Sequence, residues 1–321
     1  MRKQLAMASL SSCLFLLSCV RNPSSDTKII YAMDTVITIT LYDVSNSDTY
    51  LNNIKDIYNE VSKVSNDYKS GEDTISIYDL NMNREALVSD TLLDILKESV
   101  LLYEKTNHYF NPFIGSLSHK WKDALKSKEV LSQSEIDLEL NKMKDTSLEI
   151  NGNTVKINGL GNIDLGAIAK GYATKLAVDY LKENNISSYL INAGKSSIAL
   201  GNKAGFSLKV ALDHPLKTDK RIGIIEDKNM VISCSSLENQ NTLVDGKVYH
   251  HLLNPYTGYP AEFYDAVYVM NDNPMLGDVY STALFAMDLN DATLFASEKN
   301  INILLYKDDS TLYKSEGVEL I

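Results

Sequence analysis

One segment of the chain has residue types and a spacing suited to holding a phosphate group. The apolar stretch Val155–Gly159 predicts a strand, which leads into a glycine-spaced turn with Asp164 and then into a predicted helix with Lys170. Such a junction directs backbone N–H groups and the positive end of a helix dipole at one place, which favours an anion. The same residues suit a purely structural strand-to-helix connection, so Ile163–Ala173 alone leaves both possibilities open.

A second pair of side chains offers oxygen ligands for a metal ion. Asp278 and Thr282 are four residues apart at the start of a predicted helix that includes Val279–Met287, so we expect them on one face. One carboxylate and one hydroxyl make a sparse site that suits Mg²⁺, which keeps water ligands and relies on substrate phosphates. The alternative is structural, with Asp278 as the helix cap and Thr282 facing the core.

Two further segments carry candidate side chains. His250 and His251 end a predicted strand, where neighbouring side chains point to opposite faces, so they are a poor chelating pair for zinc. We expect at most one of them to face a site as base, acid or hydrogen-bond donor, and a structural role stays open. Tyr109 and Phe110, beside a turn at Asn111, could stack on a flat ring or belong to the core.

The elements around these segments predict one α+β domain, because strands and helices are mixed along the chain without an internal repeat or a long linker. Ser132 and Glu135 have the spacing of a capping box, and Asp90 is the expected cap of another helix. The predicted helices are Leu51–Asn66, Thr91–Thr106, 133–145 and one after the Asp164 turn that ends at Asn184-Asn185. The predicted strands are Tyr31–Asp43, Ser187–Gly194 and Phe206–Pro215, with shorter ones between 221 and 270.

The first 28 residues are expected to lie outside that domain. Arg2 and Lys3 precede an apolar run to Leu17 that is too short and weak for a good membrane span, and the run ends at Cys19 in the pattern of a bacterial lipoprotein processing site. We predict a signal peptide over 1–18, lipidation of Cys19, a flexible tether over 19–28 and a functional domain over 29–321. An ordinary signal peptide with an incidental cysteine is the alternative. The protein would then be extracytoplasmic and lipid-anchored to a bacterial membrane, on its periplasmic or outer cell-surface side.

Charge and cysteine content exclude several classes of function. The chain has 31 basic and 42 acidic residues; processing would remove Arg2 and Lys3 and leave 29 against 42, a net charge of −13. An acidic protein without a basic run is a poor nucleic-acid binder. With Cys13 removed and Cys19 lipidated, Cys234 alone would remain, so neither a disulfide framework nor a thiolate metal site is expected.

Five motifs, in order along nearly the whole predicted domain, resemble the FAD:protein FMN transferase (ApbE) family. The most specific is Ile163–Ala173, and the other four are Tyr31–Thr35, Asn111–Gly115 followed by Trp121, Tyr249–Pro260 and Asp278–Phe285. The resemblance implies a single ApbE-like, T-fold-related α+β domain with mixed or antiparallel sheets flanked by helices.

The resemblance also implies roles for individual residues. The metal ligands would be the backbone oxygen of Ala167 with Asp278 and Thr282, and Ser281 would lie nearby. Lys170 and the amides at the helix start would hold phosphate oxygens, and either His250 or His251 is a candidate general base. The contacts with FAD would fall on Met33, Tyr68, Tyr109, Phe110, Asn111, Asp164, Lys170 and Leu252.

The implied reaction is Mg²⁺-dependent transfer of FMN from FAD to a Thr or Ser hydroxyl of an acceptor flavoprotein, with release of AMP. Expected acceptors are extracytoplasmic proteins such as subunits of Rnf-type or sodium-pumping NADH:quinone oxidoreductases, or secreted flavoproteins. Two alternatives are an FAD pyrophosphatase that gives FMN and AMP, and a non-catalytic lipoprotein that binds or scavenges FAD.

The chain departs from the family pattern at several positions. Asn111 and Asn254 stand where the family usually has Asp, and Lys195 interrupts a usual Gly-Gly pair. The segment from Ser233 to Gln240 lacks a common Gly-Asp. Asp164, Asp278 and Thr282 are retained, so the sequence favours an active enzyme.

Overall fold

The computed structural model describes residues 24–201, 207–217, 219–227, 229–238, 241–308 and 310–321. The predicted signal peptide and the lipidation of Cys19 therefore lie outside the described residues. Of the expected tether, residues 25–28 belong to the first strand, β1 (Ser25–Ala32).

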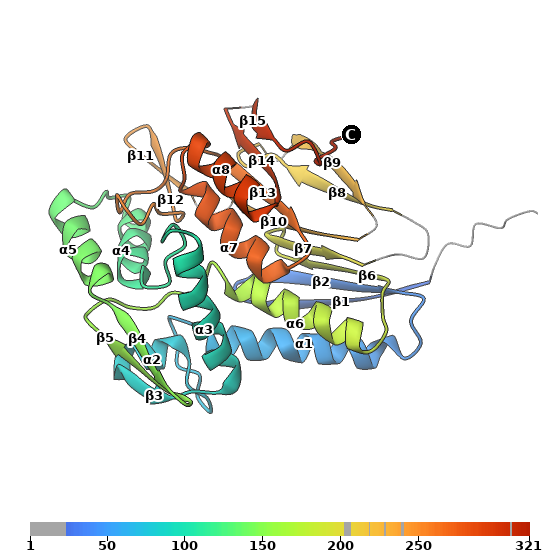
Figure 1. The fold of residues 1–321 in the computed structure, drawn as a ribbon, viewed down its shortest axis with the longest axis horizontal. Coiled ribbons are helices and arrows are strands. Elements are labelled where there is room, and N and C mark those ends of the chain that lie inside the picture. Colours follow the sequence, from blue (N-terminus) through green and yellow to red (C-terminus); the bar gives the residue numbers. More distant parts are fainter. Residues whose placement is uncertain (1–23, 202–206, 218, 228, 239–240, 309) are drawn as a thin grey trace, which may run out of the picture.

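The larger part of the molecule is an eight-stranded sheet with the order β1-β2-β6-β7-β10-β13-β14-β15, in which every neighbouring pair is antiparallel. Helices α1 (Ser47–Val64), α6 (Ala169–Glu183), α7 (Pro274–Phe285) and α8 (Leu289–Lys299) lie along one side of it (Figure 1). The remaining strands of the sheet are β2 (Thr35–Tyr42), β6 (Tyr189–Ala193), β7 (Ser197–Leu200), β10 (Met230–Ser236), β13 (Ala266–Asn271), β14 (Asn302–Lys307) and β15 (Ser310–Lys314).

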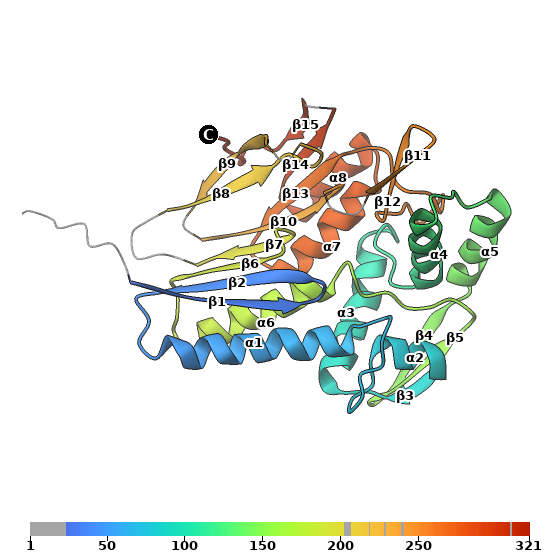
Figure 2. The ribbon, with the colours of Figure 1, turned by 180° about the vertical axis from the view of Figure 1, so that it is seen from behind.

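The opposite face of the sheet is covered by a hairpin of β8 (Leu208–Asp213) and β9 (Arg221–Asp227), seen from behind in Figure 2. Val210, Leu212 and Ile225 from this hairpin pack with sheet residues in a second, smaller core. The central strands of the sheet are therefore covered on both faces, which accounts for the nearly continuous apolar run of β13.

A smaller helical part with a three-stranded sheet lies beside the large sheet (Figure 1). Its elements are α2 (Ile77–Asn83), β3 (Glu85–Leu87), α3 (Asp90–Lys105), α4 (Gly115–Lys126), α5 (Gln133–Lys144), β4 (Ser147–Asn151) and β5 (Thr154–Asn158), and a hairpin of β11 (Asn241–Val244) and β12 (Lys247–His250) lies above them. One hydrophobic core runs through both parts, with Trp121 and Ile157 from the smaller part and Val267 from the large sheet. The predicted single α+β domain with antiparallel sheets and flanking helices is confirmed.

Three predicted boundaries differ from the structure. The predicted strand Tyr31–Asp43 is the second half of a hairpin, because Met33 and Asp34 have φ values of 54° and 55° and reverse the chain between β1 and β2. Helix α7 begins at Pro274 rather than near Val279, because the Asn273 side chain accepts hydrogen bonds from the N–H groups of Met275 and Leu276. Ser89, not Asp90, caps α3.

Other local predictions are confirmed. Ser132 and Glu135 form the expected capping box at the start of α5. Helix α6 ends at Glu183 with Asn184 as its C-terminal cap. Within the described ranges, no helix is long and apolar enough to cross a membrane.

Candidate active site

A cavity of about 850 Å³ collects most of the predicted site residues from distant parts of the chain. This volume lies within the roughly 300–1,000 Å³ range that is usual for small-molecule sites. The predicted residues that line it are Met33, Tyr68, Tyr109, Phe110, Asn111, Asp164, Ala167, Lys170, His251, Leu252, Asp278 and Thr282. His250 and Ser281 do not line it.

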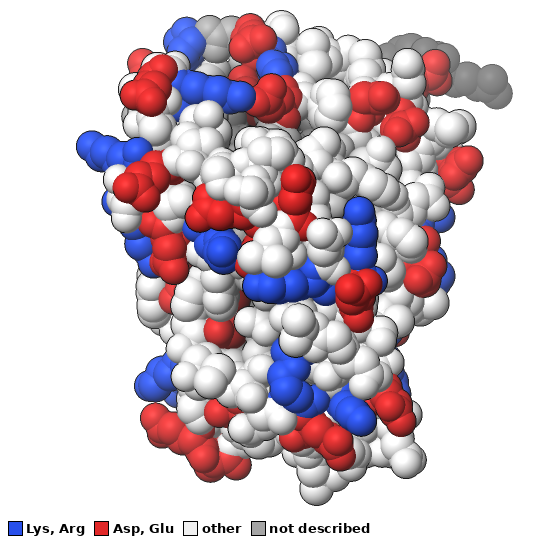
Figure 3. All heavy atoms as spheres, turned by 90° about the vertical axis from the view of Figure 1, so that its left-hand side faces the viewer, with Lys and Arg blue, Asp and Glu red and all other residues white. Residues whose placement is uncertain are grey.

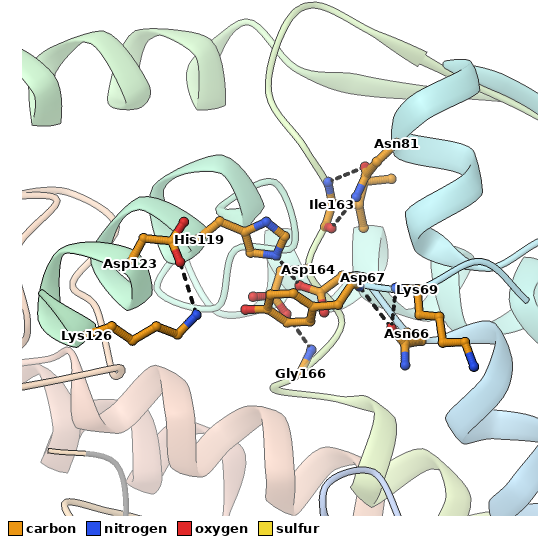
Figure 4. A network of polar contacts seen from close by, with 11 residues as sticks. Asn66, Asp67, Lys69, Asn81, His119, Asp123, Lys126, Ile163, Asp164 and Gly166 are labelled. Carbon is orange, nitrogen blue, oxygen red and sulfur yellow. Dashed lines mark hydrogen bonds and ion pairs between the residues drawn. The ribbon is translucent and has the colours of Figure 1, made fainter.

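The turn with Asp164 is held in place by α2. The Asn81 side chain accepts a hydrogen bond from Ile163 N at 2.8 Å and donates one to Ile163 O at 2.9 Å; Figure 4 shows this paired contact. Arg84 donates to the carbonyls of Gly159 and Gly161, both at 2.9 Å. A buried amide and a half-buried guanidinium thus satisfy the backbone groups of a segment that has no ladder partner.

Most backbone N–H groups of the same turn donate hydrogen bonds within the protein. The sequence instead predicts that several of them would point at a bound anion. Gly166 N donates to Asp164 Oδ1 at 2.7 Å, and Ile168 N and Ala169 N both donate to Leu165 O. The first turn of α6 therefore offers a phosphate mainly the Lys170 side chain and the Lys170 amide, for which no protein acceptor is found among the described residues.

The start of α6 leaves one carbonyl without its usual helical donor. Gly171 N donates to Asp278 Oδ2 at 2.8 Å instead of to the carbonyl four residues earlier, that of Ala167. Within the described part of the chain, no hydrogen bond to Ala167 O is found, and Ala167 lines the cavity. A carbonyl oxygen without a donor beside a carboxylate is a suitable ligand for a hard cation.

Asp278 is a buried carboxyl group in the lining of the cavity, with 4% of its surface exposed. Burial raises the pKa of Asp278 to about 6, although Lys170 and the Gly171 amide act in the opposite direction. The close approach of α6 to α7 requires glycine at 171, because a Cβ there would lie 2.5 Å from Asp278 Cβ and from Pro274 O.

The Asp278 region has the chemistry for the implied magnesium ion. Thr282, one turn further along α7, donates from its hydroxyl to Asp278 O at 3.3 Å. Ala167, Asp278 and Thr282, which carry a carbonyl, a carboxylate and a hydroxyl, all line the same cavity. These are hard oxygen donors, and they are few. In the described ranges, no group of three or more His, Cys, Asp or Glu side chains that could hold a metal ion is present, so bound phosphate and water would have to complete the shell.

Ser281 has a structural position. Its hydroxyl is buried, donates to Asp278 O at 3.0 Å and lies 2.9 Å from Ser235 Oγ. It links α7 to β10 from behind the site and does not reach the cavity.

The two adjacent histidines have different surroundings. His250 is 4% exposed, its Nε2 lies 2.8 Å from Ala261 O, and its Nδ1 accepts a hydrogen bond from Leu252 N. Burial lowers the pKa of His250 to about 4, so it is neutral and fixes the loop after β12. His251 lines the cavity. The structure therefore argues against His250 as a base and leaves His251 as the candidate.

The two aromatic residues next to Asn111 also differ in burial. Phe110 is almost wholly buried and borders the cavity from the core, whereas Tyr109 is partly exposed. The Tyr109 hydroxyl donates to Asp291 at 3.1 Å, and its ring contacts Tyr256 edge to face. Tyr109 is thus a side chain of fixed orientation available for stacking, and Phe110 supports it.

The two asparagines that replace the usual Asp act as local turn residues. Asn111 Oδ1 accepts from Phe113 N at 2.9 Å. Asn254 Oδ1 accepts from Tyr256 N, and its Nδ2 donates to Ala286 O at 3.0 Å, a bond that a carboxylate could not make. The loss of the two carboxylates is therefore compatible with an intact cavity.

The sequence motifs missed a cluster of side chains around Tyr68. His119 of α4 stacks on the Tyr68 ring with centroids 4.5 Å apart. Its Nε2 lies 2.6 Å from Asp67 Oδ2, and Figure 4 shows His119 and Asp67 close together. Lys122, one turn further along α4, places Nζ 4.8 Å from the Tyr68 centroid and lines the cavity. Their spacing of three residues next to Trp121 is the only sequence signal that marks them.

Lys195 is a second residue that the motifs did not place in the cavity. It occupies the β6–β7 turn with φ 65°, follows Gly194 with φ 64°, and lines the cavity. Its Nζ lies 2.8 Å from Asp213 and 3.0 Å from Glu238, so its charge is largely compensated.

Comparison with known proteins agrees with the fold and the motif order. The model of the ApbE family matches residues 33–305. A Vibrio cholerae protein named FAD:protein FMN transferase is 25% identical over 82% of this chain and 80% of its own, and one from Klebsiella pneumoniae is 30% identical over 56% of each. The chain thus matches little more than half the length of the Klebsiella protein.

Solved structures show the same fold. The ApbE protein of Thermotoga maritima superposes with a TM-score of 0.79 over 92% of this chain and 97% of its own, at 23% identity. The flavin transferase ApbE of Vibrio cholerae gives 0.75 over 92% and 98%, at 22% identity. With a family match over most of its length and the family's motifs gathered around one cavity, this chain belongs to the ApbE family.

Proposed function

We propose that the protein is an FAD:protein FMN transferase that requires Mg²⁺. One observation carries this proposal: Ala167, whose carbonyl lacks its helical donor, lines the same cavity as Asp278, Thr282 and Lys170. This combination suits a diphosphate with its counter-ion, and the curated relatives described above are named for cleaving such a group in FAD.

Asp278, Thr282 and the Ala167 carbonyl would hold the metal ion, which supplies charge neutralisation on the diphosphate when it is bound. Lys170 holds phosphate oxygens from the first turn of α6, and its ammonium stabilises the charge that develops as the bond to AMP breaks. The Gly171 amide keeps the Asp278 carboxylate in its position.

His251 would act as the base for the acceptor hydroxyl. It is the histidine that borders the cavity, and it follows the strand that ends at His250. Transfer requires removal of a proton from Thr or Ser as the oxygen attacks phosphorus, and an imidazole nitrogen can accept that proton. Tyr109 would retain the isoalloxazine ring by stacking.

We further propose that the protein acts outside the cytoplasm while held to a bacterial membrane by a lipid on Cys19, and that its acceptors are extracytoplasmic flavoproteins. The support is the order of a basic start, an apolar run and Cys19 in the sequence. Labelling with a radioactive fatty acid in a bacterial host, with Cys19→Ser as the control, tests the anchor.

Incubation of the purified protein with FAD, Mg²⁺ and a candidate acceptor tests the activity. Transfer predicts flavin fluorescence on the acceptor in a denaturing gel with AMP in solution. Free FMN with AMP would instead indicate a pyrophosphatase, and intact bound FAD would indicate a storage protein.

The variant Asp278→Asn should lower AMP release by at least roughly a hundredfold, because it removes the one carboxylate of the metal site. Glu298→Gln, the same chemical change on the exposed side of α8, is the control and should leave the rate unchanged. Full AMP release by Asp278→Asn would show that the metal assignment is wrong.

A further inference from the structure

Lys122 is a charged side chain inside the cavity that the proposed chemistry does not use. It lies on α4, is half-buried, and borders the cavity together with Tyr68 and Asp164. Burial acts against its charge, but Asp164, followed by Tyr68 and Asp67, outweighs burial and holds the pKa of Lys122 above its ordinary value. Lys122 is therefore a cation in this cavity.

Lys122 and Asp164 both line the cavity, near enough for their charges to interact. Their charges interact strongly enough to stabilise the ammonium, yet within the described part of the chain no ion pair or hydrogen bond joins them. Asp164 uses Oδ1 to accept from Gly166 N, which leaves lone pairs on its other oxygen. A donor group and an acceptor group thus line the same cavity near each other, both with hydrogen-bonding capacity to spare.

The surroundings of this pair favour a flat ring over a phosphate. Tyr68 and His119 stack next to Lys122, whereas Lys170 and Asp278 mark the phosphate and metal part of the cavity. A carboxylate such as Asp164 would repel a phosphate but would accept a hydrogen bond from a ring N–H. The imide edge of isoalloxazine presents a carbonyl beside an N–H, which matches a donor beside an acceptor.

We propose that Lys122 and Asp164 bind the imide edge of the isoalloxazine ring, with the Lys122 ammonium donating to a ring carbonyl and the Asp164 carboxylate accepting from the ring N–H. The inference rests on the proposed use of FAD. It makes Lys122 a ligand-contacting residue that selects the flavin half of the dinucleotide, while Lys170 binds the diphosphate. The Tyr68–His119 stack, anchored by Asp67, holds the aromatic wall beside it.

Binding of separate parts of FAD to the full chain tests this assignment. The probes are riboflavin, which lacks phosphate, N3-methylriboflavin, in which the imide N–H is blocked, ADP with Mg²⁺, and FAD. The variant is Lys122→Met, which keeps the length of the side chain and removes its charge. The matched control is Lys126→Met on the same helix, where the lysine is exposed and paired with Asp123 (Figure 4).

Dissociation constants come from flavin fluorescence quenching and, for ADP, from calorimetry. We expect Lys122→Met to weaken riboflavin and FAD at least about tenfold, since a hydrogen bond to a charged group is lost, and to leave ADP within about twofold. N3-methylation should weaken binding to the unaltered chain at least about tenfold and should weaken binding to Lys122→Met by a smaller factor. Lys126→Met should behave as the unaltered chain, and Lys122→Arg should retain riboflavin within a few-fold.

Three results would overturn the inference while leaving the proposed function in place. They are unchanged riboflavin binding by Lys122→Met, an equal loss of ADP and FAD affinity, and tolerance of the N3-methyl group by the unaltered chain. If the unaltered chain bound neither FAD nor ADP with Mg²⁺, the proposed function would fail as well.

Discussion

His251 and His250 are neighbours in sequence, but we expect the first to affect the rate of transfer and the second to affect stability. Replacement of His251 by Asn should reduce FMN transfer by about 10²–10⁴-fold, the usual contribution of a general base, and should leave the dissociation constant of FAD nearly unchanged. Single-turnover transfer to an acceptor and flavin fluorescence measure the two quantities. A large loss of FAD affinity with an unchanged rate would assign His251 to binding.

His250 predicts a pH dependence of stability. Its pKa is lowered to about 4 in the folded protein against 6.5 in the unfolded chain, so the unfolded chain binds the proton first as the pH falls. Above pH 6.5, His250 is neutral in both states and stability should not depend on its titration. Between pH 6.5 and pH 4, protonation of His250 in the unfolded chain should reduce the free energy of unfolding by up to about 3 kcal/mol. Urea unfolding of the unaltered protein and of His250→Gln measures this.

The difference in stability between these two proteins should shrink as the pH is lowered through that window. The glutamine variant lacks the titrating group, so it should be less stable at pH 7 and should lose less stability by pH 4.5. A constant difference across the window would show that His250 does not titrate as its burial implies.

At the scale of elements, α2 holds the Asp164 turn through one side chain. Asn81→Leu should leave the N–H and the carbonyl of Ile163 without partners in a buried place, at a loss of about 3 kcal/mol in the free energy of unfolding. Activity should fall as well, since the turn with Asp164 loses its support. Asn83→Ala, on the exposed end of α2, is the control in thermal unfolding and AMP release.

The contact between α6 and α7 is a second element-scale test. Gly171→Ala would place a methyl group against Asp278 and the Pro274 backbone, so we expect the helices to separate, with a loss of about 1–3 kcal/mol from overpacking. Because α7 carries Asp278 and Thr282, AMP release should fall more steeply than stability. Lys182→Ala, on the exposed side of α6, should change neither. Full activity of Gly171→Ala would show that the contact can relax.

Sequence patterns located the helices and strands better than their ends. Alternation in Tyr31–Asp43 continues across the turn at Met33 and Asp34, so periodicity alone does not reveal the reversal. The cap at Asn273 lies outside the apolar pattern of α7, and without it Asp278 could be taken for a cap itself. The engagement of the Gly171 amide in the first turn of α6 depends on Asp278, 107 residues later, which no local pattern contains.

At the scale of the whole molecule, the sequence predicted some site residues, whereas others depend on how distant elements pack together. Motif order placed Asp164, Lys170, Asp278 and Thr282, and the fold brings them to one cavity. Sequence alone could not choose between His250 and His251, because the choice depends on which side of the loop faces the core. Lys122 and His119 were missed because their significance arises from α4 packing beside Tyr68.

The overall charge predicts how FAD reaches the cavity. The chain carries a net charge of −11, and Figure 3 shows acidic and basic side chains interspersed over one face. Long-range repulsion of the anionic dinucleotide should be screened by salt, so the association rate of FAD should rise with ionic strength. Stopped-flow fluorescence at 20 and 200 mM salt measures this, with uncharged riboflavin as the control. A rate that falls with salt would show that the cavity lysines dominate the field.

The Ala167 carbonyl, which lacks its usual helical donor, has a consequence for the evolution of the sequence at this position. A backbone oxygen is supplied by any amino acid, so the identity of residue 167 can drift while the oxygen stays available. What must persist is the departure from regular helical bonding, which depends on the Gly171 amide and the Asp278 carboxylate together. Positions 171 and 278 are therefore expected to covary among related proteins, whereas position 167 should vary freely even though its carbonyl oxygen is needed.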